Sequence, residues 1–94
     1  MVLAAQVLEL PRGAKLNART ADISRTGCYV DTLHPTPVGT QVLLRITHFN
    51  EAFEAVGPVI YTSPCLGMGV AFSEIAPEEV SKLDRWLANP EGDY

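Results

Sequence analysis

Asp22, Ser24 and Gly27 form the pattern D-x-S-x-x-G, and their types and spacing could recognise a ligand. A carboxylate at Asp22 can accept hydrogen bonds from the N1–H and the exocyclic amine of a guanine base, and the Ser24 hydroxyl can donate or accept beside it. Gly27 has no Cβ, so a ligand or another backbone segment can approach it closely. The pattern therefore indicates a purine-binding site.

The same residue types are also common in the turn between two strands, which is a second interpretation of this segment. Asp and Ser side chains often bond their own backbone in such turns, and Gly tolerates the backbone bend. The local pattern is compatible with a turn as well as with a ligand site.

Four of the seven Lys and Arg residues crowd around this segment, namely Arg12, Lys15, Arg19 and Arg25. Residues 1–45 hold five cations and three acids, whereas residues 46–94 hold two cations and eight acids. A small anion could be attracted to the basic side, so Arg12, Arg19 and Arg25 are candidate contacts. The alternative is that these arginines are solvated turn and strand-edge residues.

Short stretches of alternating apolar residues predict an all-β domain. Strands are expected over residues 2–9, 19–24, 28–31, 40–46, 53–61 and 68–72. Within 19–24 the alternation places Thr20, Asp22 and Ser24 on one face. Pro58 cannot donate to a ladder, so it predicts a bend or bulge in its strand.

A helix is predicted after the last strand. Pro77 suits its first turn, and Val80, Leu83 and Leu87 form an apolar stripe at i, i+3 and i+7. This stripe, joined by Trp86, is expected to close an open end of a small barrel. We expect one domain over residues 1–88 and a short tail over residues 89–94.

Several segments together resemble a PilZ domain. They are the D-x-S-x-x-G pattern from Asp22 to Gly27, the run Gly27-Cys28-Tyr29-Val30, the turn Pro37-Val38-Gly39, the segment Gly57-Pro58-Val59-Ile60-Tyr61, and Gly67-Met68-Gly69-Val70-Ala71-Phe72 ahead of the helix. The resemblance extends from about Val2 to Leu87. Together with the strand pattern, it implies a bacterial, small six-stranded antiparallel β-barrel with a C-terminal α-helix.

The resemblance implies a signalling module that binds the second messenger cyclic di-GMP. Asp22 and Ser24 would contact a guanine, and Gly27 would leave room for it. The family also uses a basic R-x-x-x-R stretch before the first strand, which would lie upstream of Val2. Lys15 and Arg19 have that spacing, but they follow the first strand and do not correspond to the motif by position.

The missing basic half predicts weak nucleotide binding by this chain. A charge-assisted hydrogen bond contributes ~1.5 to 3 kcal/mol, so losing two of them weakens binding by roughly a hundredfold to ten-thousandfold. The alternative function is that of a degenerate PilZ domain, which does not bind the nucleotide and acts as an adaptor between proteins.

Other classes of function find little support in the sequence. His34 and His48 have no evident nucleophile beside them, so we expect no catalytic residues and place both histidines on surface loops. Cys28 and Cys65 lack the spacing of metal ligands, and neither a metal nor a cofactor is expected.

Location and partners are predicted from charge and hydropathy. A net charge of -4 argues against DNA or RNA binding. No apolar run reaches the ~20 residues of a membrane span, and the N-terminus lacks the features of a signal peptide. We expect a cytoplasmic protein.

Overall fold

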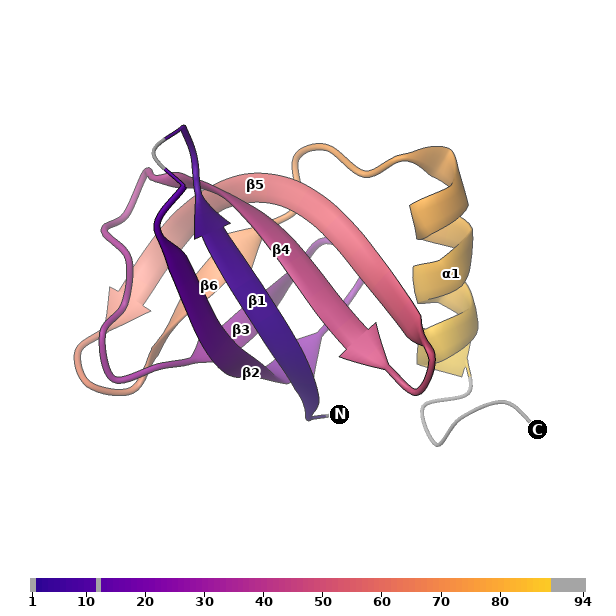
Figure 1. Ribbon diagram of the computed structural model, residues 1–94, viewed down its shortest axis with the longest axis horizontal. Helices are drawn as coiled ribbons and strands as arrows, with labels where there is room; N and C mark the ends of the chain where they lie inside the picture. The colour runs from indigo at the N-terminus through magenta and orange to yellow at the C-terminus, as the bar shows by residue number, and fades with distance from the viewer. Residues whose placement is uncertain (1, 12, 89–94) are drawn as a thin grey trace.

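The structure of the chain is a computed structural model, which describes residues 2–11 and 13–88. Its elements are β1 (Leu3–Glu9), β2 (Lys15–Ile23), β3 (Gly27–Asp31), β4 (Gln41–His48), β5 (Glu51–Ser63), β6 (Gly67–Ala71) and α1 (Pro77–Ala88). The six strands close into a barrel in the order β1-β2-β3-β6-β5-β4, and every neighbouring pair is antiparallel (Figure 1). The predicted fold class is confirmed, while the expected tail over residues 89–94 lies outside the described residues.

Two strands are longer than the alternation predicted. β2 begins at Lys15 instead of Arg19, and β5 runs from Glu51 to Ser63. Both extensions are held by pairing with a neighbouring strand, such as that of Lys15 with Leu8. In β2 the added residues Leu16 and Ala18 pack against the core and continue the alternation, which the prediction did not use. In β5 backbone hydrogen bonds to β4 and β6 extend the strand through the polar residues Glu51 and Ser63.

β5 bends and changes partners near Pro58, as the sequence indicated. Its first part pairs with β4 as far as Pro58, and its last part pairs with β6. The β5–β6 register shifts between Val59 and Tyr61. This change of partner turns a corner of the barrel, which a small closed sheet requires.

The core fills the barrel with side chains from alternate strand positions. On β4 the inward residues Val42, Leu44 and Ile46 are fully buried. The remaining buried apolar residues are Ala5, Val7, Cys28, Val30, Phe53, Ala55, Val59, Met68, Val70, Leu83 and Trp86. The residues between these inward positions point outward and are more exposed than the core residues. A ligand would therefore bind on the outer surface of the barrel, since side chains fill its interior.

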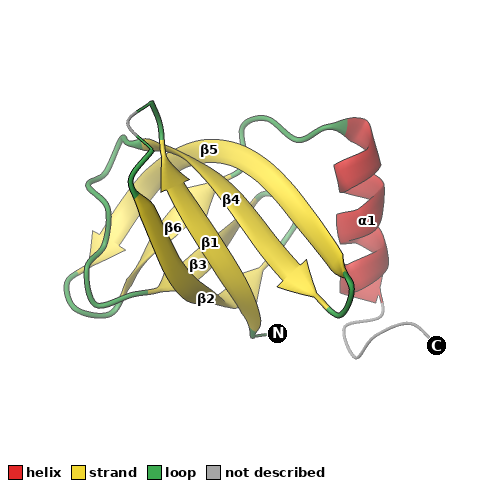
Figure 2. Ribbon diagram, in the orientation of Figure 1, coloured by secondary structure: helices red, strands yellow, loops and turns green. Residues whose placement is uncertain are grey.

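The two ends of the barrel are closed by different elements. α1 covers one end with Leu83 and Trp86, both buried, as the apolar stripe predicted. The loop between β3 and β4 covers the opposite end, where the buried Thr36 donates its backbone N–H to Met68 Sδ at 3.3 Å. Figure 2 shows the helix and this loop at opposite ends of the molecule.

A polar cluster fastens α1 to the β4–β5 hairpin. The Glu51 carboxylate accepts a hydrogen bond from Trp86 Nε1 at 2.9 Å and pairs with the Arg85 guanidinium. The Trp86 hydrogen bond, followed by the Arg85 charge, lowers the pKa of Glu51 below its usual value of 4.5. The hairpin thus holds the helix by charge as well as by apolar packing.

His48 differs from its predicted place on a surface loop. It is the last residue of β4 and is partly buried, with its ring centroid 5.2 Å from that of Trp86. Its Nε2 atom is buried without a hydrogen-bond partner among the described residues. The helix covers this histidine, which the sequence pattern did not indicate.

Candidate functional site

A bulge in β2 turns Asp22 to the outside of the barrel. Thr20 pairs with Val30 and Asp22 pairs with Tyr29, so Ala21 is an extra residue between two consecutive pairs. Thr20 is fully buried, whereas Asp22 is exposed. The prediction that these two share a face is wrong, because an extra residue reverses the inward and outward alternation beyond it.

Ser24 remains on the outer side with Asp22, but its hydroxyl organises the turn that follows β2. Ser24 Oγ accepts from the Thr26 backbone N–H at 3.3 Å and donates to the Gly27 carbonyl at 3.3 Å. The Ser24 backbone N–H also donates to the Gly27 carbonyl, at 2.9 Å. Ser24 therefore makes the contacts that the turn interpretation of this segment predicted.

Gly27 lets the backbone of a neighbouring strand come close. Its φ is not in the left-handed region, and it pairs with Ala71 at the start of β3. A Cβ at this position would fall well inside contact distance of the Val70 carbonyl oxygen. The glycine is thus needed for packing between β3 and β6, whatever it contributes to a ligand.

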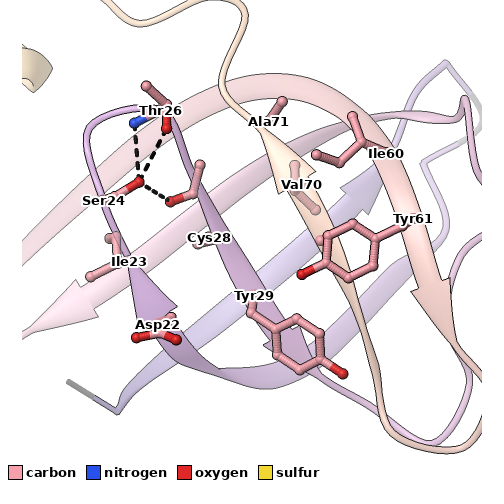
Figure 3. A pocket seen from close by; sticks show the side chains of 12 residues that line it. Asp22, Ile23, Ser24, Thr26, Cys28, Tyr29, Ile60, Tyr61, Val70 and Ala71 are labelled. Atoms are coloured by element: carbon pink, nitrogen blue, oxygen red, sulfur yellow. Dashed lines mark hydrogen bonds between the residues drawn. The ribbon is translucent and has the colours of Figure 1, made fainter.

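An open pocket of about 440 Å³ lies on the outer surface beside this turn (Figure 3). Its lining comes from β2, β3, β5, β6 and the β2–β3 turn, and comprises Asp22, Ile23, Ser24, Thr26, Gly27, Cys28, Tyr29, Ile60, Tyr61, Gly69, Val70 and Ala71. Asp22 is the one charged residue in this lining. Among the described residues, nothing donates a hydrogen bond to its carboxylate or pairs with it.

Tyr29 and Tyr61 form an aromatic surface in the pocket. Their ring centroids are 6.1 Å apart and their planes differ by 30°, and Figure 3 shows the two rings side by side. The Tyr61 ring occupies the space where a side chain at Gly69 would lie. Because Gly69 has no side chain, the ring can pack closely against β6.

Sequence reasoning missed both tyrosines as site residues. Cys28 and Val30 are apolar and buried, so their alternation was a signal that Tyr29, which lies between them, points outward. The pairing of β2 with β3 then places Tyr29 beside Asp22. No comparable signal existed for Tyr61, because its nearness to Tyr29 depends on both β3 and β5 pairing with β6.

The predicted arginines do not line the pocket in the described part of the chain. Arg25 forms an ion pair with Asp84 on α1, with 2.9 Å between Nε and Oδ1. Arg19 is exposed on β2, on the other side of the bulge from Asp22. Arg12 lies outside the described residues, so its predicted role is not addressed by the structure.

The described residues offer no other evident chemistry at this site. They contain no group of His, Cys, Asp or Glu that could hold a metal ion. Over the same residues, no helix is both long and apolar enough to cross a bilayer. What the pocket provides is one carboxylate, two aromatic rings and polar groups of a turn.

The comparisons with known proteins agree on one family. The sequence model of the PilZ domain matches residues 3–89. The inhibitor of motility of Bacillus subtilis (MotI/DgrA) has a structure similar to this chain, with a TM-score of 0.78 and 20% identity over 97% of this chain. The PilZ domain of CeSA from a cellulose-synthesizing bacterium gives a TM-score of 0.76 with 16% identity over 98% of this chain. Among curated protein sequences there is no match.

The coverage of these proteins differs. The chain spans 47% of the Bacillus subtilis protein but 95% of the CeSA domain. At such low identity the structural likeness shows the fold alone. The sequence match, in contrast, extends over nearly the whole chain, and this chain belongs to the PilZ domain family, a family of cyclic di-GMP receptors.

Proposed function

We propose that this chain binds cyclic di-GMP in the pocket beside the β2–β3 turn, with Asp22 accepting the N1–H and exocyclic amine of one guanine. PilZ domains are generally non-catalytic binding or adaptor modules, and the proposal is of that kind. The observation that carries it is the Asp22 carboxylate, which the bulge turns outward at the edge of the pocket and which no other described residue engages. A paired or inward carboxylate would be unable to read a base.

The tyrosines supply the apolar part of the proposed site. Stacking of a base on an aromatic side chain contributes ~1 to 3 kcal/mol. Tyr29 is the pairing partner of Asp22 across β2 and β3, so the ring and the carboxylate project from neighbouring positions on the same side. A base that lies on the ring can present its edge to the carboxylate.

Charge favours this pocket over the other large groove of the domain. That groove has a volume of about 650 Å³ and lies between the β4–β5 sheet and the start of α1. Its lining includes four carboxylates, from Glu54, Glu74, Glu78 and Glu79. Glu54 and Glu79 are paired with Arg45 and Lys82, but Glu74 and Glu78 add to a lining that disfavours the phosphates of a nucleotide. The pocket beside the turn has Asp22 as its one carboxylate.

In the described part of the chain, no Lys or Arg side chain that could bind a phosphate lines the pocket. Arg25 lies between Ser24 and Thr26, which line the pocket, and its side chain is already paired with Asp84. Asp84 thus competes with a phosphate for this guanidinium. We therefore expect this chain to bind cyclic di-GMP weakly. The contact between Asp22 and guanine should account for most of its preference for this nucleotide.

Titration of the 15N-labelled chain with cyclic di-GMP, followed by NMR, tests the proposal at the affinities expected. Amide signals of the Asp22 to Tyr29 segment and of Tyr61 should shift together. Asp22→Ala should weaken binding by about tenfold or more, since a hydrogen bond to a charged group contributes ~1.5 to 3 kcal/mol. Asp31→Ala is the matched control, because Asp31 is an exposed carboxylate on β3 that does not line the pocket.

Cyclic di-AMP provides the control on the ligand side. Adenine presents an acceptor at N1 and no amine at C2, so the Asp22 carboxylate should disfavour it. Equal shifts with both dinucleotides, or full binding by the Asp22→Ala variant, would show that the carboxylate does not read a guanine.

An adaptor that does not bind nucleotide is the second candidate function. The observation in its favour is that the Ser24 hydroxyl bonds within the turn and the Arg25 side chain pairs with Asp84 on α1, so both side chains are already engaged by other groups. In that case millimolar cyclic di-GMP should leave the spectrum of the chain unchanged.

A further inference from the structure

An exposed apolar surface covers the barrel end that lies opposite α1. It consists of Leu33 and Val38 in the β3–β4 loop and Leu66 in the β5–β6 hairpin, which are 69%, 58% and 68% exposed. Pro37, Pro64 and Cys65 are exposed beside them. We call these six residues the apolar cap. Figure 1 shows the loop and the hairpin together at one end of the long axis, with α1 at the other.

Backbone contacts hold the two segments of the apolar cap in place. The Thr32 N–H donates to the Leu66 carbonyl at 3.1 Å, which joins the loop to the hairpin. The Gly39 N–H donates to the Val59 carbonyl at 2.8 Å, and the buried Thr36 anchors the middle of the loop. Pro37 and Pro64 also restrict the backbone. A surface ordered before binding loses less entropy when a partner covers it.

The apolar cap lies in the part of the chain that has no charge. Residues 32–44 and 55–73 contain no Asp, Glu, Lys or Arg. Among the described residues, Glu9, Lys15 and Asp31 lie at the strand termini of this end of the barrel, and they are of both signs. An apolar centre with a mixed polar rim is the usual anatomy of a protein interface.

Acidic residues gather at the opposite end instead. α1 and the hairpin beneath it contain Glu51, Glu78, Glu79 and Asp84, with Lys82 and Arg85 among them. The domain is 37 Å along its longest axis. Two copies that meet through their caps would hold these acidic ends far beyond the ~8 Å over which charges interact at physiological ionic strength.

We propose that the apolar cap is the interface through which two copies of this chain associate. A charge-free surface can face itself across a two-fold axis without like charges meeting, and every exposed leucine then has an apolar counterpart. A strongly charged partner would find no ion pair at its centre. The apolar cap shares no residue with the lining of the nucleotide pocket, and its proposed role does not depend on the proposed function.

Analytical ultracentrifugation of the 94-residue chain tests this proposal. Because the apolar cap comprises only six residues, we expect a weak dimer. The average mass should rise from 10.2 kDa towards twice that value as the concentration is raised from about 10 µM to about 1 mM. Leu33→Glu and Leu66→Glu should each weaken the association by about tenfold or more, since both place a charge against its own copy. Raising the salt should not weaken association of the unmodified chain, because no ion pair holds it.

Val2→Glu is the matched control. Val2 is an apolar residue of similar exposure, 62%, and it precedes β1 away from the apolar cap. This variant should associate as the unmodified chain does. A monomer at every concentration would overturn the proposal, as would a dimer that Val2→Glu disrupts as much as Leu33→Glu. All variants should keep the thermal midpoint of the unmodified monomer, because the substituted side chains are exposed.

Alkylation of Cys65 gives a second readout on the same surface. Its thiol is exposed beside Leu66, whereas burial raises the pKa of Cys28 to about 12 and keeps that thiol unreactive. The rate of Cys65 alkylation should fall several-fold between dilute monomer and concentrated dimer. An unchanged rate in a sample shown to be dimeric would place the interface elsewhere.

Discussion

Arg25 and Asp84 form an ion pair, with 2.9 Å between Nε and Oδ1, that joins the β2–β3 turn to α1. Their side chains are 66% and 48% exposed, so the pair contributes little to stability, at most ~1 kcal/mol. Its weakness means that a phosphate group can compete with Asp84 for the guanidinium. The Arg25 side chain thus connects the turn beside the candidate pocket to α1.

Removing the Asp84 charge should increase the affinity for cyclic di-GMP. Asp84→Asn frees Arg25 from its partner, and we expect a gain of about twofold to fivefold, in proportion to the modest energy of an exposed pair. Calorimetric or NMR titration measures the change. Glu78→Gln is the control, because it removes one negative charge from α1 without touching Arg25; an equal gain in both variants would mean that only the overall charge matters.

Replacing Gly27 by Ala should destabilise the domain in the absence of any ligand. The new Cβ would collide with the Val70 carbonyl, and the two strands must move apart at a cost of about 1 to 3 kcal/mol. Urea denaturation provides the measurement. Thr26→Ala, in the same turn, should cost less than about 0.5 kcal/mol. If Gly27→Ala leaves the midpoint unchanged, the close approach to β6 is not needed for folding.

Truncating Leu83 should be among the most damaging changes to the helix. Leu83 is fully buried at the barrel end, and Leu83→Ala should cost ~2 to 5 kcal/mol out of the ~5 to 15 kcal/mol of a typical domain. Leu87→Ala should cost less, because Leu87 is only partly buried. Thermal melts compare the two. A stable Leu83→Ala domain that no longer binds a partner would identify the helix as an interaction surface.

The Glu51 cluster predicts a pH dependence of stability. Its pKa is lowered in the folded state, so the stability that its charge contributes is present above the usual pKa of 4.5 and is lost as the pH falls through the lower folded value. Glu51→Gln keeps an acceptor for Trp86 but removes the charge. The thermal midpoint of this variant should lie below that of the unmodified chain at neutral pH, and the difference should shrink below about pH 4.5.

Glu54→Gln is the control for that experiment. Glu54 forms an exposed ion pair with Arg45 that lies within the β4–β5 ladder and does not engage Trp86. Its substitution should have a smaller effect on the midpoint. A pH-independent difference for Glu51→Gln would mean that packing, and not charge, explains the loss.

The approximate positions of the strands along the chain, the inward face of β4 and the apolar stripe of α1 could all be predicted from residue patterns. Val42, Leu44 and Ile46 alternate with polar neighbours, and a half-buried strand leaves that signature wherever it pairs. The turn between Asp22 and Gly27 was predictable for the same reason, because Ser24 bonds to groups within three residues of itself. These features depend on local chemistry.

The direction of Asp22 and the partner of Arg25 depended on the tertiary structure. Simple alternation places Thr20 and Asp22 on one face, and only the pairing of β2 with β3 creates the bulge that separates them. Arg25 was predicted to contact a ligand, yet it reaches Asp84 because α1 packs across the barrel end beside the turn. Register and ion pairs between distant segments arise from closure of the barrel, which brings together residues that no local pattern connects.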